Sequence, residues 1–511
     1  MVKKITLYFR QHPIFLISVC YFVFRLIHLT RLPVFGDEAI YLDWAWRETT
    51  QPGLLFYSLY DAKQPLLMWF FGIAMQVLSD PFFAGRFVSV ICGLITLLGI
   101  YSLGKTYFTS RVAVLASLLY IITPLFSFYD RQALMEAGVG AVGIWVLWYA
   151  LRFWKNGKAS DAVYAGVLLG VGFFIKSSAL IFLAAFILIS IWLWWKKQTV
   201  TFVPLFYSSA AFLSTIALLL LQPRFWQTLS SNSRYGFGFR DFLSLPLVEW
   251  GTNLLGNGEI GVLFMTPVVF CCSILGLVVA FRRQKKQVGI LVVWVVIVLF
   301  LQTVVVRSTS QRYLVSYLPP LLMFAAYFLV LLLEKYKGFL RQGMMVTLLF
   351  LIPLVITVVQ VYNPVLYFRM YSFSRFSESS YLTGGTSGYG IKEAIAYIET
   401  LPKKGKIFVG ESLYTGNPES AVMIWFAKSR TVTVGYLDRR LLGDIVDKSE
   451  CLKAGIPVYF MSKGDDVAGL ERFLENMVYL KNPYNKNVIG IWKAKENCTG
   501  DVLPVQLVNI Q

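Results

Sequence analysis

Two adjacent carboxylates stand out in a chain that is otherwise mostly apolar. Asp37 and Glu38 lie in the segment PVFGDEAIYLDWAW at residues 33–46, directly after the first long apolar run. A carboxylate at a membrane surface can act as a general base that takes a proton from a hydroxyl or an amine. An acid directly after a span is more often a solvated loop residue, so the other charges of the chain must decide between these interpretations.

Further charged side chains mark the ends of other apolar runs. They are Lys63, Arg86, Asp130, Arg131, Lys176 and Arg312, with Tyr313 beside the last. Each one alone is an ordinary interfacial residue. Together they are more informative, because charged groups at membrane depth are costly and tend to mark function. Lys and Arg can hold a phosphate and stabilise its negative charge as it leaves, so the set predicts a site for a phosphate-bearing donor.

The composition indicates that these residues belong to a membrane protein. Of the 511 residues, 57% are hydrophobic and 15% are charged, and the mean hydropathy is +0.62. Such values are typical of polytopic membrane proteins. The net charge of +19 does not indicate nucleic acid, because most Lys and Arg lie in short loops between apolar runs. We expect no cleavable signal peptide, since the first run lacks a small-residue cleavage site.

Runs of about 18–22 apolar residues can cross the roughly 30 Å hydrocarbon core of a bilayer. About eleven spans are predicted, near 13–30, 86–104, 112–129, 134–151, 162–175, 178–195, 202–222, 260–281, 288–306, 313–333 and 342–362. The stretch 65–79 is shorter, and we expect it to be a juxtamembrane helix that does not cross. If it crossed, every later loop would change sides and the basic loops would lie outside, against the positive-inside rule.

This topology places the N-terminus in the cytoplasm and the unusual charges on the opposite face. The outer face would receive 31–85, 130–133, 176–177, 223–259, 307–312 and everything after 363. Nucleotide sugars are scarce outside the cytoplasm, so a sugar carried on a lipid phosphate is the expected donor there. The cell membrane is therefore the predicted location, with the C-terminal part extracytoplasmic.

The composition changes sharply after residue 362. Strand-like segments at 406–410, 430–437, 456–462 and 487–494 alternate with helical patterns at 390–401, 418–428, 438–447 and 466–476. The alternation predicts a small α/β domain with a partly parallel sheet. The Ser-, Gly- and Tyr-rich stretch 371–390 would be a linker or a ligand-contacting loop. We thus expect a transmembrane domain over 1–362 and an α/β domain over 363–511, in which Cys451 and Cys498 could pair.

The motifs of the N-terminal two-thirds resemble those of the polytopic GT-C glycosyltransferases of family 39 type. That family includes protein O-mannosyltransferases and the lipid A aminoarabinose transferase. The matching motifs, in order, are FGDEAIY, KQPL, GRFVSVICG, YDRQALMEA, IKSSAL and QRYLVSYLPP. The resemblance implies a GT-C fold and a sugar donor linked to a polyprenyl phosphate.

The resemblance also implies roles for individual residues. Asp37 would be the catalytic carboxylate, and Glu38 would help to shape the acceptor site. Lys63 would contact the lipid phosphate, Arg86 would bind the donor phosphate, and Asp130 would face the same cavity. A further phosphate-binding arginine belongs to the long outer loop before the later spans, where Arg224 and Arg234 are both candidates.

The chain departs from the family pattern at two positions. Gln64 stands where the family has the first proline of its lysine motif, and Ala62 stands where the aminoarabinose transferase has a metal-holding Glu. The chain has 2 histidines, both in or near the first span. No cofactor is therefore expected, and the sequence does not support a divalent metal. The chain also lacks a β-trefoil domain, so a protein acceptor is not implied.

These observations predict an inverting glycosyltransferase that uses Asp37 as general base. The donor would be a polyprenyl-phosphate sugar, and the acceptor a lipid, a glycan or a protein in or at the lipid bilayer. The alternative is a polytopic lipid or polysaccharide transporter or flippase, whose signature would be broken helices and charges near mid-span. A non-catalytic envelope anchor is a third interpretation, for which eleven spans are excessive. The clustering of charges at helix ends on one side favours the enzyme.

Overall fold

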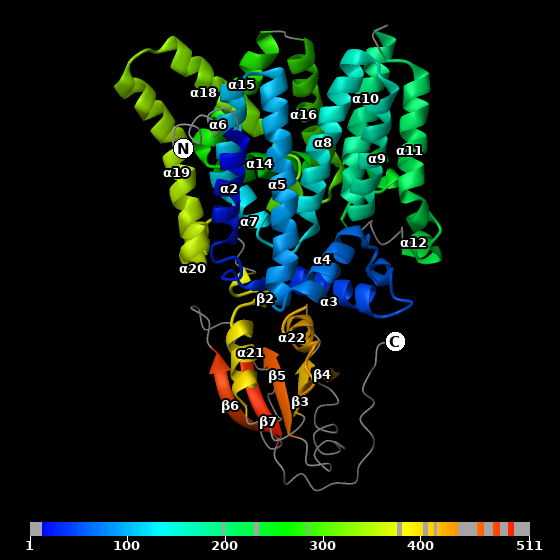
Figure 1. Cartoon of the computed structure of the whole chain (residues 1–511), viewed down its shortest axis with the longest axis vertical. Helices are drawn as coiled ribbons and strands as arrows, with labels where there is room; N and C mark the ends of the chain where they lie inside the picture. Colours follow the sequence, from blue (N-terminus) through cyan, green and yellow to red (C-terminus); the bar gives the residue numbers. More distant parts are fainter. Residues whose placement is uncertain are drawn as a thin grey trace, which may run out of the picture. The chain divides into compact units, whose positions relative to one another are not determined.

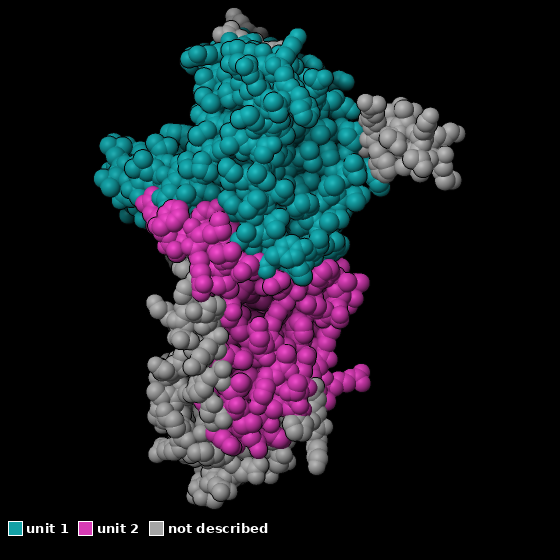
Figure 2. Space-filling view, turned by 90° about the vertical axis from the view of Figure 1, so that its left-hand side faces the viewer, with its two compact units in different colours: residues 1–29, 53–70, 86–362 teal, residues 30–52, 71–85, 363–511 magenta. Residues whose placement is uncertain are grey.

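The computed structural model describes residues 13–196, 200–228, 235–283, 286–375, 381–401, 407–412, 416–437, 457–463, 474–480 and 489–494. It divides into two compact units, coloured separately in Figure 2. Unit 1 contains 1–29, 53–70 and 86–362, and unit 2 contains 30–52, 71–85 and 363–511. This division differs from the expected boundary at residue 362, because residues 30–52 and 71–85 pack with the C-terminal part.

Unit 1 is a bundle of apolar helices (Figure 1). Its principal helices are α2 (Pro13–Leu26), α5 (Pro81–Tyr107), α6 (Ser110–Ile122), α8 (Met135–Asn156), α9 (Ala159–Ile175), α10 (Leu180–Trp195), α11 (Phe202–Leu220), α14 (Leu247–Phe264), α15 (Pro267–Arg282), α16 (Lys286–Val305), α18 (Leu321–Lys335) and α19 (Phe339–Tyr362). Among the described residues, six helices are long and apolar enough to cross a membrane, or seven with a bent pair counted as one span. All eleven predicted runs coincide with a helix or a helix pair. The prediction of a polytopic helical membrane protein is confirmed.

Three predicted spans are interrupted, in each case beside a proline. The run 112–129 forms α6 and then α7 (Pro124–Tyr129), and the run 313–333 forms α17 (Gln311–Leu314) and then α18. The run 260–281 is shared by α14 and α15, and the chain bends by 119° between these two helices. Proline has no N–H for the helix ladder and clashes with the preceding turn, so it favours a break or a kink at these places.

Two further segments are helical where a loop was expected. The segment 223–259 contains α12 (Pro223–Thr228), α13 (Phe239–Leu243) and most of α14. The acidic pair lies in the first turn of α3 (Gly36–Thr50).

The helix predicted over 65–79 is present as α4 (Leu66–Val77).

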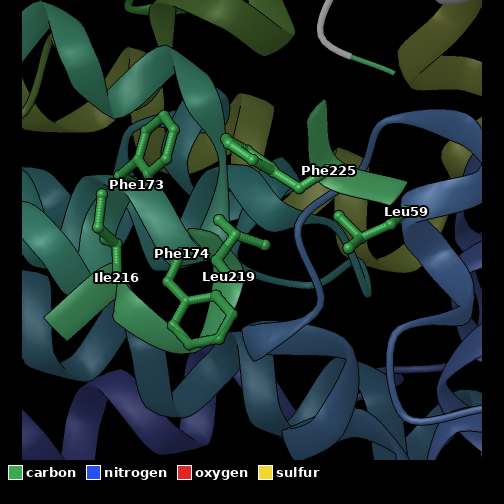
Figure 3. Close-up of a cluster of buried hydrophobic side chains, with 6 residues drawn as sticks. All are labelled: Leu59, Phe173, Phe174, Ile216, Leu219 and Phe225. Atoms are coloured by element: carbon green, nitrogen blue, oxygen red, sulfur yellow. The ribbon is translucent and has the colours of Figure 1, made fainter. Parts of the chain in front are cut away.

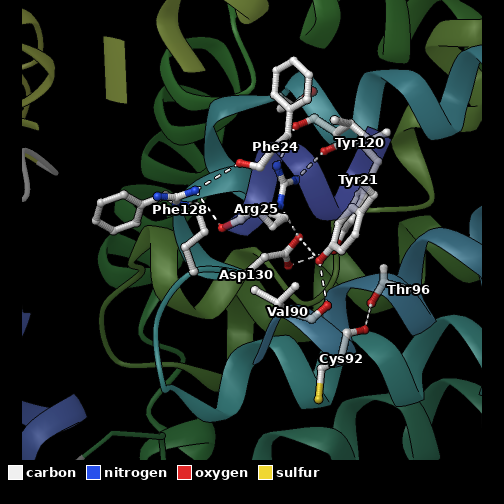
Figure 4. Close-up of polar contacts among 12 residues, drawn as sticks. Tyr21, Phe24, Arg25, Val90, Cys92, Thr96, Tyr120, Phe128 and Asp130 are labelled. Carbon is white, nitrogen blue, oxygen red and sulfur yellow. Dashed lines mark hydrogen bonds and ion pairs between the residues drawn. The ribbon is translucent and has the colours of Figure 1, made fainter. Parts of the chain in front are cut away.

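The break before Pro124 leaves carbonyl groups at the end of α6 that a buried arginine satisfies. Arg25 of α2 donates through Nη1 to the Ile121 carbonyl at 2.7 Å and through Nη2 to the Tyr120 carbonyl at 3.1 Å (Figure 4). In an unbroken helix the Tyr120 carbonyl would accept from the residue at position 124, which is a proline. Arg25 therefore replaces a helix bond that the sequence cannot make.

Asp130 balances the charge of Arg25. Its Oδ2 lies 3.1 Å from Arg25 Nε and accepts from the Tyr21 hydroxyl at 3.1 Å, and its Oδ1 accepts from the Tyr120 hydroxyl at 2.9 Å. The next residue, Arg131, donates to the carbonyls that end α2, at Phe24, Arg25 and His28. A buried ion pair survives in a low dielectric only with this kind of hydrogen-bonded surround.

Unit 2 contains a five-stranded sheet with the order β4-β3-β5-β7-β6. Its strands are β3 (Ile407–Ser412), β4 (Val432–Leu437), β5 (Val458–Lys463), β6 (Leu474–Leu480) and β7 (Ile489–Ala494). Strand β3 is parallel to β4 and β5, whereas β7 is antiparallel to β5 and β6. Two helices, α21 (Ile391–Thr400) and α22 (Glu419–Phe426), accompany the sheet (Figure 1). The expected partly parallel α/β arrangement is therefore present.

The details of unit 2 correct two expectations. The predicted helix 466–476 is wrong at its end, because Leu474 begins β6, where β-branched and aromatic neighbours favour a strand. The stretch 371–390 is not a free linker in its described part, since Tyr381 and Leu382 are buried and Ser387–Gly388 forms β2. The predicted helix 438–447, Cys451 and Cys498 lie outside the described residues.

The Arg25–Asp130 pair generates a stability prediction. Asp130→Asn removes the only carboxylate that the structure shows bonded to Arg25, which leaves a buried cation uncompensated. We expect a loss of about 3–5 kcal/mol in the free energy of unfolding. Tyr120→Phe is the matched control, and it should cost about 1 kcal/mol because one hydrogen bond is lost. Chemical unfolding in detergent measures both, and an Asp130→Asn protein as stable as the wild type would contradict the role of the pair.

Candidate functional site

Glu136 is the centre of a charged cluster in unit 1. Its Oε1 accepts from Lys176 Nζ at 2.5 Å and from Arg312 Nε at 2.8 Å. Glu136 lies in the first turn of α8, Lys176 directly follows α9, and Arg312 belongs to α17, so three distant segments meet here. The side chain of Glu136 is 2% exposed, whereas those of Lys176 and Arg312 are 17% and 16% exposed. The acid is thus buried beneath two cations that remain accessible.

Lys63 lies beside this cluster. The short helix η1 (Tyr57–Asp61) ends at Ala62, which adopts a left-handed conformation with φ of +57°, and Lys63 follows. Lys63 Nζ lies 4.6 Å from the ring centroid of Tyr235 and 4.0 Å from Asp61 Oδ2. The next side chain, Gln64, accepts through Oε1 from the Ser177 backbone N–H at 3.2 Å. This bond ties the Lys63 turn to the residue that follows Lys176.

Apolar packing holds the same turn in place. Figure 3 shows one buried cluster to which η1, α9, α11 and α12 all contribute, made of Leu59, Phe173, Phe174, Ile216, Leu219 and Phe225. Leu59 is 1% exposed, so η1 is anchored against the end of the helix that leads to Lys176. Burying a large apolar side chain contributes about 1.5–3 kcal/mol, so Leu59 helps to stabilise the position of this turn.

The electrostatics of the cluster favour an added anion. Burial lowers the pKa of Lys176; Glu136 opposes this shift, whereas the positive charges of Arg312 and Lys63 add to it. Lys176 Nζ also lies 5.4 Å from the ring centroid of Tyr313, an electron-rich surface that attracts a cation. Three cations share one buried acid and one half-exposed Asp61, so a phosphate here would relieve their mutual repulsion.

The other predicted cations have different surroundings. Arg86 is fully buried and donates through Nη1 to the Leu29 carbonyl at 3.0 Å. The guanidinium of Arg224 lies 3.9 Å from the ring centroid of Tyr60. Asp130 and Arg131 belong to the buried network that closes α2 and α6, and Arg234 lies outside the described residues. The structure thus brings Lys63, Lys176, Arg312 and Tyr313 together. The contacts that it shows for Asp130 and Arg131 are with residues of α2 and α6 and with those next to these helices.

In unit 2 the structure distinguishes the two adjacent acids. Glu38 is fully buried, and its Oε2 accepts from the Phe35 backbone N–H at 3.3 Å, which caps the start of α3. Asp37 is only partly buried. The peptide dipoles of a first helical turn favour a negative side chain at this place. Of the pair, Asp37 is therefore the carboxylate that keeps an accessible surface.

Two residues of these networks were missed by the sequence analysis. Glu136 lies within the motif YDRQALMEA, and Arg25 lies inside the first apolar run. A charged residue inside a spanning segment is itself a signal of a specific partner, and that signal could have identified both. Within the described residues, no three His, Cys, Asp or Glu side chains converge as metal ligands would.

Part of the chain matches a known protein family. Residues 62–226 match the family model of dolichyl-phosphate-mannose-protein mannosyltransferase, a range that includes Lys63, Glu136 and Lys176. No curated protein sequence shows significant similarity to the chain.

The solved structures of ArnT share the fold at low sequence identity. ArnT from Cupriavidus metallidurans, crystallised with undecaprenyl phosphate and in the apo state, is 14% identical, with a TM-score of 0.58 over 96% of this chain and 99% of that one. The Archaeoglobus fulgidus oligosaccharyltransferase is 13% identical, with a TM-score of 0.49 over 93% of this chain and 73% of that one. The expected resemblance is confirmed: the chain is a polytopic membrane protein with the GT-C fold, similar over residues 62–226 to the dolichyl-phosphate-mannose-protein mannosyltransferases.

Proposed function

We propose that the protein is an inverting glycosyltransferase that moves a sugar from a polyprenyl-phosphate donor to an acceptor at the extracytoplasmic membrane face. The observation that carries this proposal is that Lys176 and Arg312 share the buried Glu136 and that Lys63 lies close to Lys176. The similar ArnT structure was crystallised with undecaprenyl phosphate, which is the class of lipid phosphate proposed here. The acceptor would be a lipid, a glycan or a protein.

The reaction is a single displacement at the anomeric carbon of the sugar. Asp37 takes the proton from the acceptor hydroxyl or amine as its oxygen or nitrogen attacks that carbon. The bond between the carbon and the phosphate oxygen breaks, and its electron pair leaves with the polyprenyl phosphate. One displacement inverts the configuration at the carbon. The negative charge that develops on the leaving phosphate is the charge that fixed cations can stabilise.

The proposed phosphate site uses cations that are already held in place. Glu136 holds both Lys176 and Arg312 through one oxygen, so neither needs to be ordered when the donor binds. Binding groups that are ordered in advance cost less conformational entropy on association. Arg86 and an arginine of the 223–259 loop, Arg224 or Arg234, are proposed as further donor contacts on the strength of the resemblance.

Asp37→Asn tests the proposed base. The amide keeps the shape of the carboxylate but cannot take the proton, so we expect sugar transfer to fall about 100- to 10,000-fold. Binding of undecaprenyl phosphate should be unchanged. Glu393→Gln is the matched control, because Glu393 is an exposed acid in the first turn of α21 in the same unit. The measurement is the rate of sugar transfer by each purified protein with a polyprenyl-phosphate sugar as donor. An Asp37→Asn protein of wild-type activity would remove Asp37 from the mechanism.

Lys63→Met tests the proposed phosphate site. Loss of one charge-assisted hydrogen bond should weaken undecaprenyl phosphate binding about 10- to 100-fold. Lys155→Met is the control, since Lys155 is an exposed lysine in the last turn of α8. Fluorescence or calorimetric titration in detergent gives both dissociation constants. Equal affinity in the Lys63→Met and Lys155→Met proteins would exclude Lys63 from phosphate binding.

The proposed orientation has its own test. We expect the exposed Ser79, replaced by Cys in a cysteine-free background, to react with an impermeant thiol reagent added outside intact cells. A cysteine at Lys155 should react only after permeabilisation, because the basic loops belong inside. Labelling of the Ser79→Cys protein only from the cytoplasmic side would reverse the topology.

A lipid transporter is the second candidate, and one observation favours it. The helix pair α14 and α15 is bent by 119°, and broken helices are common at transporter substrate sites. Reconstituted vesicles separate the two functions: movement of a lipid-linked sugar between leaflets without covalent transfer would favour the transporter.

A further inference from the structure

The backbone that leads to Asp37 pairs with the C-terminal part of the chain. Strand β1 (Val34–Phe35) pairs antiparallel with β2 (Ser387–Gly388), with Val34 opposite Gly388 and Phe35 opposite Ser387. The Gly36 N–H then donates to the Thr386 carbonyl at 2.9 Å. A two-residue ladder is marginal by itself, so other contacts must hold it.

Two glycines allow this close approach. A Cβ at Gly388 would clash with the Val34 carbonyl oxygen, and a Cβ at Gly416 would clash with the Gly36 carbonyl oxygen and lie 2.7 Å from Ile40 Cγ1. Gly416 also has φ of +89°, which disfavours any other residue. The segment 34–36 is therefore in backbone contact with two separate loops of the C-terminal part.

Asn417 links these elements through its side-chain amide. Its Nδ2 donates to the Val34 carbonyl at 3.0 Å and to the Thr386 carbonyl at 2.9 Å, and the residue is fully buried. Two carbonyl oxygens can only be satisfied by the NH₂ end of the amide, so this orientation is determined by its partners. One side chain thus bonds to β1 and to the residue that directly precedes β2.

The loops that make these contacts are themselves fixed to the sheet. Lys463, the last residue of β5, donates to the carbonyls of Gly385 (2.8 Å) and Ser387. Glu419 at the start of α22 accepts from the Gly416 N–H at 2.6 Å, and α22 packs along α3. The position of the residues before Asp37 is thereby connected to the five-stranded sheet.

We infer that the C-terminal α/β domain positions the carboxylate of Asp37 for the reaction, with Asn417 and Gly416 as the positioning residues. The inference rests on the proposed function, because it takes Asp37 as the base. Its physical basis is that α3 begins at Gly36, so any shift of residues 34–36 moves the first turn of the helix and the Asp37 side chain with it. A misplacement of about 1 Å can cost on the order of 100-fold in rate.

Asn417→Asp is the direct test, in the full-length protein. The substitution keeps the size of the side chain but places a carboxylate against two carbonyl oxygens. We expect kcat to fall about tenfold or more while undecaprenyl phosphate binding is unchanged. Backbone amides of residues 34–38 should exchange with deuterium about tenfold faster, with β3 and β5 still protected. Glu475→Gln, an exposed acid on β6 of the same sheet, is the control and should alter neither quantity.

A double-mutant cycle distinguishes positioning from general destabilisation. If Asn417 acts through Asp37, Asn417→Asp should cost less than about twofold in the residual activity of the Asp37→Asn protein. An equal loss of activity in both backgrounds would overturn the inference. Faster exchange at 34–38 with unchanged kcat, or unchanged exchange and kcat, would also overturn it.

A second variant covers a failure of Asn417→Asp to fold. Gly416→Ala adds one methyl group against the Gly36 carbonyl, and it should give the same local exchange and the same dependence on Asp37. Failure of the proposed function and failure of this inference give different results. Wild-type activity of the Asp37→Asn protein would remove the proposed base. Hydrogen exchange at residues 34–38 reports whether Gly416 and Asn417 hold this segment, whatever the activity.

Discussion

The interaction on which the candidate site depends is the carboxylate of Glu136 shared by two cations. Lys176 and Arg312 would repel each other without an acid between them, and Lys63 adds a third positive charge. Burying the acid and leaving the cations partly exposed gives a surface with preorganised positive charge. Part of the cost of burying the carboxylate is offset because Oε1 of Glu136 is bonded to both cations, whereas Oε2 is buried without a hydrogen bond to any residue that the structure describes. A phosphate is the ligand that such a surface is suited to bind.

The two units contribute different parts of the proposed reaction. Unit 1 contains the three cations, which follow η1, follow α9 and lie in α17, and the buried Leu59 cluster packs beside the first two. Unit 2 supplies the carboxylate on the first turn of α3, held by strand pairing, two glycines and Asn417. In each unit the reacting group lies on a short segment whose neighbours are fixed by backbone hydrogen bonds. With Asp37 as the proposed base, this organisation is the basis for inferring that the C-terminal domain positions it.

Much of the fold could be predicted from the sequence because its signals are local. The apolar runs, the basic loops and the strand–helix alternation after residue 362 each follow from composition and spacing. The breaks at Pro124 and Pro267 also have a local cause, although the angle between the two helices does not. The helix that begins at Gly36 was not anticipated, since its stability depends on tertiary contacts with α22.

The candidate site was predictable in part for the same reason. Lys63, Lys176, Arg312 and Tyr313 could be grouped by face, because the positive-inside rule assigns each loop to a side. The contacts among these residues could not be derived from the sequence. Glu136 joins Lys176, which is 40 residues further along the chain, and Arg312, which is 176 residues further along. The contacts of the buried Arg25 and those of Gly416 and Asn417 also join segments far apart in the chain. The spacing of residues in the sequence does not predict such contacts.

The central claim is that the cluster around Glu136 binds the phosphate of a polyprenyl-phosphate donor. An electron cryomicroscopy structure of the protein with undecaprenyl phosphate tests this most directly. The account predicts phosphate oxygens within hydrogen-bonding distance, about 2.7–3.2 Å, of Lys63 Nζ and of Lys176 or Arg312. Density for the phosphate at another place, with these three side chains unchanged and in contact only with the protein, would contradict it.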